Sequence, residues 1–228
     1  MNLNIPYMET DNKLLNDAYR IAAGDIVGNI VYYQNGLLTE EKPCMIAGLD
    51  YNTPWTRDTA INIWNVLSIL SPEVSKNTLL AVLEEEEGNI YIGGQYWDSI
   101  IWMIGAREYC RFHKDDNFYR LAFEAGRNSV HRLEEDEFDE EDGLFRGPAV
   151  YGDGIAAYPD KYSKCPNQGS GILEWVDYPG NPVYPKGYGI PMKALSTNCV
   201  YFKVYEILAE MAHALGEPAK EFEEKAAA

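Results

Sequence analysis

The chain has 228 residues, of which 46% are hydrophobic and 13% aromatic, and its formal net charge is −17. This length allows one large domain or two small ones with a sizeable core, and the composition is that of a globular protein. The negative charge argues against nucleic acid and against an anionic membrane as partners, because Lys and Arg bind both of these surfaces.

The N-terminal residues MNLNIPYMETD lack the basic and apolar regions of a signal peptide, and no apolar run approaches the ~20 residues of a membrane helix. The four cysteines show no CxxC spacing, which favours reduced thiols in a cytoplasmic protein. His113, His131 and His213 lie far apart on predicted helices. Because metal ligands normally come in clusters, we expect no metal site, and we expect no cofactor.

Hydrophobic periodicity predicts an all-α chain of helices in series, joined by irregular loops. Pro72 suits a first helical position, and Gly216 suits a helix end. Gly88, Gly93 and Gly94 predict a turn, with a short strand at Ile90–Ile92. The predicted helices cover about Asp11–Gln34, Arg57–Leu70, Pro72 to the acidic cluster Glu84–Glu87, Trp97–His113, Asp116–Glu135 and Met192–Leu215, and a seventh begins at Glu217-Pro218.

The character of these helices predicts which of them are buried. Residues 97–113 are apolar on most faces, as in a buried helix, whereas residues 116–135 have a polar face. We expect Trp64 and Trp102, both in mid-helix, to be core residues. The acidic runs Glu84–Glu87 and Glu134–Asp142 are typical of solvated faces or turns.

A long segment without helical periodicity runs from Phe138 to about Pro191 and is rich in Gly, Pro, Tyr and Asp. So long an irregular segment is either disordered or functional, and its many aromatic residues favour the functional interpretation. Asp153 lies in it between two glycines. Asp-Gly is a common turn pair, so Asp153 is either a turn residue or a catalytic one.

The stretch DYNTPWTRDTAINIWN places Trp55, Arg57 and Asp58 together at a predicted helix start. Thr56 or Asp58 could act simply as an N-cap, and an acid there also suits the helix dipole. Comparable starts recur at Tyr96-Trp97-Asp98 and at Ser196-Thr197-Asn198.

If alternate helices form an inner layer, these starts converge on one rim and line a pocket of rings and carboxylates. Such a pocket suits a sugar, since pyranose C–H faces stack on aromatic rings and hydroxyls need donors and acceptors. The ring of Trp55 would then be a platform, and the pair of Arg57 and Asp58 would be a clamp for adjacent hydroxyls.

Four blocks together resemble the bacterial six-hairpin glycosidases, relatives of glycoside hydrolase families 63, 37 and 15. They are AGLDYNTPWTRDTAINIWN, GGQYWDSIIWMIGAREY, GLFRGPAVYGDGIAAYPD and GYGIPMKALSTNCVYFKVYEILAEMA. The resemblance runs from about residue 10 to 215. It implies an (α/α)6 toroid and inverting hydrolysis of an oligosaccharide or glycoside, and residues 1–228 would form a single, incomplete toroid domain.

The resemblance also implies roles for particular residues. Asp153 matches the position of the general acid, and burial among rings such as Tyr151 would raise its pKa. Asp98 and Glu174 are the fallback acids. The catalytic base lies in a late hairpin, expected beyond residue 228, because twelve helices need on the order of 350 residues or more. The expected substrate-binding residues are Trp55, Arg57, Asp58, Tyr96, Trp97, Asp98, Tyr151, Glu174 and Trp175.

Other activities fit the same scaffold. A glycoside phosphorylase would use phosphate in place of water, whereas a sugar epimerase would need histidines at the helix starts, where this chain has none. A non-catalytic sugar-binding half-domain is a further alternative. In an incomplete toroid, the apolar faces of the inner helices would be exposed, and the chain could self-associate through them.

Overall fold

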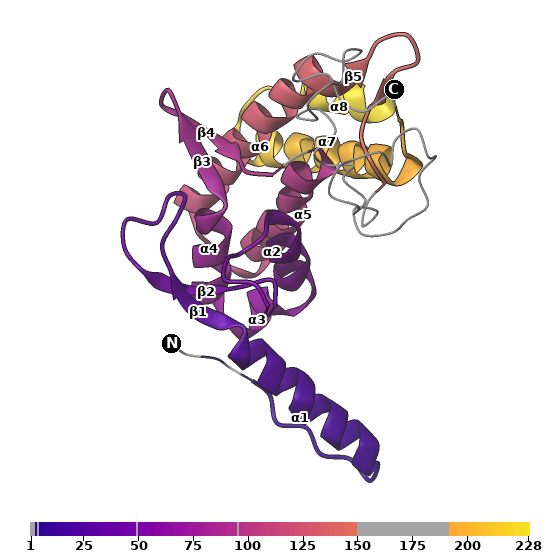
Figure 1. Cartoon of the computed structure of the whole chain (residues 1–228). Coiled ribbons are helices and arrows are strands. Elements are labelled where there is room, and N and C mark those ends of the chain that lie inside the picture. The colour runs from indigo at the N-terminus through magenta and orange to yellow at the C-terminus, as the bar shows by residue number, and fades with distance from the viewer. Residues whose placement is uncertain (1–2, 4, 49, 95, 150–191) are drawn as a thin grey trace, which may run out of the picture. The chain divides into compact units, whose positions relative to one another are not determined.

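The computed structural model shows a mainly helical protein with short antiparallel strand pairs (Figure 1). It describes residues 3, 5–48, 50–94, 96–149 and 192–228. Its helices are α1 (Lys13–Gly28), α2 (Thr56–Asn62), the π-helical turn η1 (Ile63–Leu67), α3 (Ser68–Leu70), α4 (Pro72–Ala81), α5 (Trp97–Phe112), α6 (Asp116–Glu137), α7 (Leu195–Leu215) and α8 (Lys220–Ala227). No helix in this described part is long and apolar enough to cross a membrane.

The predicted first helix ends earlier than expected. Asn12 caps α1 by accepting from the backbone N–H groups of Leu14 and Leu15, and the helix stops at Gly28. Residues 30–33 form strand β1 (Ile30–Tyr33), which pairs with β2 (Lys42–Met45). The prediction of helix to Gln34 was therefore wrong, because β-branched and aromatic residues in succession favour a strand when a partner is available.

The predicted second helix is confirmed but is not regular. Residues 56–70 continue as α2, η1 and α3, and the Ser68 hydroxyl donates to the Ile63 carbonyl oxygen at 2.9 Å. This bond spans the five residues of a π-helical turn. Such turns often occur near functional sites.

The predicted third helix begins at Pro72 as expected but ends at Ala81, so the prediction that it reaches the acidic cluster was wrong. Ser71 caps α4 by accepting from the Val74 N–H, and Pro72 takes the first helical position. The acidic cluster then enters β3 (Leu83–Glu86), which pairs with β4 (Asn89–Ile92), and residues 84–87 are exposed as expected. The short strands β5 (Phe138–Asp139) and β6 (Leu144–Phe145) also pair with each other.

The chain falls into two compact units, the first of residues 1–93 and 102–122 and the second of residues 94–101 and 123–228. Helices α5 and α6 contribute residues to both. The single toroid domain predicted from the sequence stays a prediction.

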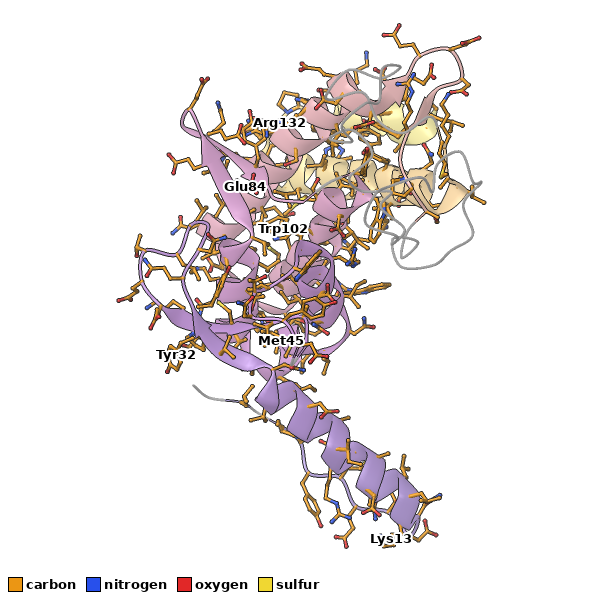
Figure 2. All side chains as sticks on the ribbon, in the orientation of Figure 1. Lys13, Tyr32, Met45, Glu84, Trp102 and Arg132 are labelled. Atoms are coloured by element: carbon orange, nitrogen blue, oxygen red, sulfur yellow. The ribbon has the colours of Figure 1, made fainter. Side chains whose placement is uncertain are left out.

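The core of the first unit is built around α4 and the later part of α5. Trp102 is fully buried, and its Nε1 donates to the Leu79 carbonyl oxygen at 3.2 Å, so its predicted place in the core is confirmed (Figure 2). Gly105 lies directly against the backbone of Ala60, which lets α2 and α5 approach closely. Trp64, by contrast, is 49% exposed, so its prediction as a core residue was wrong.

The second unit is organised by α7, which carries buried Tyr201, Val204 and Leu208 along one side. Helix α7 ends at Gly216, as the sequence predicted, and this glycine adopts the left-handed conformation. Helix α8 follows and lies beside α7 (Figure 1). Phe222 of α8 is buried, with its ring edge-on to Phe123 at 6.1 Å.

Candidate functional site

The start of α2 differs from a simple capped helix end. Its N-cap residue is Trp55, which makes no side-chain capping bond. The Thr56 hydroxyl is directed elsewhere and donates to the Gly93 carbonyl oxygen at 2.9 Å. Asp58 lies in the first turn, where its charge suits the helix dipole. The capping role considered for Thr56 is therefore replaced by a bond that ties α2 to the end of β4.

Two aromatic rings meet at this helix start. Tyr51 and Trp55 lie with ring centroids 5.8 Å apart and planes at 71°, an edge-to-face arrangement. Tyr51 is 52% exposed and Trp55 is 41% exposed. Edge-to-face pairs are energetically favourable, so the two rings hold each other in place while both keep solvent-accessible surface.

An ion pair lies beside these rings. The Arg57 guanidinium carbon is 5.7 Å from the centroid of the Trp55 ring, within the range of a cation–π contact. Its Nε lies 3.8 Å from an Asp58 carboxylate oxygen, and the two side chains are 15% and 35% exposed. We call Tyr51, Trp55, Arg57 and Asp58 the aromatic corner.

The aromatic corner brings together apolar and polar groups of different kinds. Its rings offer apolar surface, Arg57 carries hydrogen-bond donors, and Asp58 carries acceptors. Sequence reasoning had included Trp55, Arg57 and Asp58 but had missed Tyr51, four residues earlier in the preceding loop.

The start of α5, in the second unit, is buried. Tyr96, Trp97 and Asp98 all have little or no exposed surface. Tyr96 adopts a φ of 51°, which is unusual for a residue other than glycine. Trp97 has no exposed ring face for a sugar in this conformation. The predicted convergence of three helix starts around one pocket stays a prediction.

The start of α7 makes hydrogen bonds to β6 and to the residues that follow it. The Thr197 hydroxyl donates to the Pro148 carbonyl oxygen, and Asn198 bonds Phe145. The Gly147 N–H donates to the Met192 carbonyl oxygen at 2.8 Å, and Gly147 also bridges to Lys193. Residues 147 and 192 are thereby held together on either side of residues 150–191.

The acidic run of residues 134–142 is only partly solvated, which corrects the sequence interpretation. Glu137 is buried, and Asp139 lies between two cations, 2.6 Å from Arg146 and 2.7 Å from Lys193. The hydrogen bond from Lys193 is the main cause that lowers the pKa of Asp139. The pairing joins residues that lie on either side of positions 150–191 in the sequence, so no local sequence signal revealed it.

Asp153, the predicted general acid, lies outside the described residues, as do Tyr151, Glu174 and Trp175. Their predicted roles therefore rest on the sequence alone.

A cluster of possible metal ligands occurs in the second unit, where ligand atoms of His131, Glu134 and Glu221 lie within 4.8 Å of one another. The Lys225 ammonium lies 2.6 Å from Glu134 and 2.7 Å from Glu221, so it already supplies positive charge there.

Burial raises the pKa values of the Cys44 and Cys110 thiols to about 12. Both thiols therefore stay protonated at neutral pH and are poor nucleophiles.

Comparison of the chain with protein-family models, with curated proteins and with solved structures finds no match.

Proposed function

We propose that this chain binds a neutral carbohydrate as part of an inverting glycoside hydrolase with an (α/α)6 toroid fold. The observation that carries the proposal is the aromatic corner. Its two rings are exposed next to a donor-bearing guanidinium and an acceptor-bearing carboxylate. This is the combination that stacks on a pyranose face while bonding adjacent hydroxyls.

In the proposed reaction, Asp153 protonates the glycosidic oxygen as the bond to the anomeric carbon breaks. A second carboxylate takes a proton from the water that attacks the opposite face of the sugar. The two carboxyl groups of inverting enzymes stand roughly 6.5–9.5 Å apart to leave room for that water. By the resemblance, this base comes from a later hairpin of the toroid.

The direct test of binding is calorimetry of this chain with a panel of neutral methyl glycosides and disaccharides. The variant Asp58→Asn should bind the best ligand more weakly by about 1–3 kcal/mol, because it loses a hydrogen bond to a charged group. Asp25→Asn on exposed α1 is the matched control and should bind like the parent chain. If no sugar in the panel bound to the parent chain, the proposal would be wrong.

The role of Asp153 has a separate test in a polypeptide that includes the catalytic base. Asp153→Asn should slow hydrolysis of ordinary glycosides by about 10²–10⁴-fold, as expected for loss of general acid catalysis. Hydrolysis of a glycosyl fluoride should suffer much less, since fluoride leaves without a proton. Equal losses on both substrates would exclude Asp153 as the acid and direct attention to Asp98 and Glu174.

A non-catalytic sugar-binding protein is the second candidate. It is favoured by the fact that the whole aromatic corner lies within the first unit. Binding in calorimetry without turnover in the longer polypeptide would support it over the hydrolase. Acceleration of cleavage by phosphate, with a sugar phosphate as product, would instead show a phosphorylase.

A further inference from the structure

Tyr51 is positioned by the loop that precedes α2. Its backbone N–H donates to the Gly48 carbonyl oxygen at 3.0 Å, closing a tight turn. Two residues later, the Thr53 carbonyl oxygen accepts from the Ala47 N–H at 3.5 Å. The loop that carries Tyr51 is therefore tied across its base, and the Tyr51 ring makes an edge-to-face contact with Trp55.

The two rings of the aromatic corner differ in what remains open to a ligand. The guanidinium of Arg57 lies over the ring of Trp55 and occupies space on that side. Tyr51 has the larger exposed fraction of the two. Because Arg57 covers one side of the Trp55 ring, a flat ligand can stack on Tyr51 without displacing that guanidinium.

We propose that Tyr51 is a sugar-contacting residue, whose ring provides the main stacking surface for a neutral pyranoside at the aromatic corner. This inference rests on the proposed function, and it specifies the ligand further. Stacking requires a sugar face with several C–H groups, so glycosides that lack such a face should bind less well. Anionic sugars are disfavoured, because a chain with a net charge of −17 repels them.

Tyr51→Ala removes the ring, whereas Tyr51→Phe keeps the stacking surface and removes only the hydroxyl. Tyr32→Ala is the matched control, since Tyr32 is 67% exposed on strand β1, opposite Pro43 (Figure 2). Thermal unfolding of each variant shows whether the fold is kept.

Binding is measured by titration calorimetry of each protein with six sugars: methyl glucoside, methyl mannoside, methyl galactoside, maltose, cellobiose and lactose. We expect Tyr51→Ala to weaken binding of the best ligand roughly tenfold, as for loss of a central aromatic contact. Tyr51→Phe and Tyr32→Ala should stay within about twofold of the parent chain, since stacking depends on the ring and Tyr32 lies on another element.

The outcomes separate this inference from the proposed function. If the parent chain binds a sugar and Tyr51→Ala binds it equally well, the stacking role of Tyr51 is wrong while the proposed function stands. If Tyr51→Phe loses as much affinity as Tyr51→Ala, the hydroxyl matters and the ring does not, which also overturns the inference. If the parent chain binds no sugar in the panel, both proposals fail.

Discussion

The side-chain amide of Asn198 bonds both backbone polar groups of Phe145. The Phe145 N–H donates to Asn198 Oδ1 at 2.8 Å, and Asn198 Nδ2 donates to the Phe145 carbonyl oxygen at 3.1 Å. The same Nδ2 also donates to the Ala194 carbonyl oxygen. Asn198, in the first turn of α7, thus satisfies both backbone polar groups of Phe145 in β6.

Replacing Asn198 with Ala should destabilise the protein, because it leaves partly buried backbone groups of Phe145 without partners. We expect the free energy of unfolding to fall by about 1–3 kcal/mol, measured by urea denaturation. Asn65→Ala is the control, since Asn65 is exposed and donates to the Ile61 carbonyl of its own helix. Equal losses in the two variants would show that the bonds to Phe145 add nothing to stability.

Gly105 and Gly24 form a second matched pair, one at a helix crossing and one on an open helix face. A Cβ at position 105 would lie 2.8 Å from the Ala60 Cα, whereas a Cβ at position 24 would meet nothing within 4 Å. Gly105→Ala should therefore cost about 1–3 kcal/mol of stability through overpacking. Gly24→Ala should raise stability by about 0.5–1 kcal/mol, because alanine is the better helix former.

Thermal and urea unfolding of both glycine variants would check this prediction. A stabilised Gly105→Ala protein would mean that α2 and α5 can separate without loss.

The two mid-helix tryptophans should differ in the same way. Trp102 is fully buried and hydrogen-bonded to Leu79, whereas Trp64 is half exposed. Trp102→Ala should lower the free energy of unfolding by about 3–5 kcal/mol. Trp64→Ala should lower it by less than about 1 kcal/mol, since surface substitutions have small effects. The more conservative Trp102→Phe keeps the result interpretable if Trp102→Ala fails to fold.

Much of the helical framework could be predicted because its signals are local. The cap at Ser71-Pro72, the left-handed end at Gly216 and the apolar helix α5 all follow from short-range preferences. Strand β1 could not be predicted in this way, because its stability depends on pairing with β2 about ten residues later. Trp64 lies in the π-helical turn, where the 3.6-residue period behind the prediction does not hold.

The candidate site was predictable to the extent that its residues are neighbours in the sequence. Trp55, Arg57 and Asp58 belong to one helix start, and the structure keeps them together. Tyr51 required knowledge of the loop conformation that brings its ring to Trp55. The ion pair of Asp139 with Lys193 joins residues more than fifty positions apart in the sequence, so no periodicity or motif could have revealed it.

The ion pairs of Asp139 should make the stability of the protein depend on pH in the acidic range. Hydrogen bonding by Lys193, then by the Glu141 N–H, lowers the pKa of Asp139 below that of an unfolded aspartate, which is about 3.9. A lowered pKa in the folded state means that the stabilisation is fully present above the unfolded pKa. It is lost as the pH falls through the lower, folded value. The stability of the protein should therefore fall below about pH 4, in part because Asp139 takes up a proton.

Asp139→Asn should remove this part of the acid sensitivity. The variant should be less stable than the parent protein at pH 6, and the difference should shrink toward pH 3, in urea denaturation at a series of pH values. Asp142→Asn is the control, because Asp142 is more exposed and its removal leaves Asp139 bonded to Arg146 and Lys193. A stability difference that stayed constant with pH would show that the charge of Asp139 does not stabilise the fold.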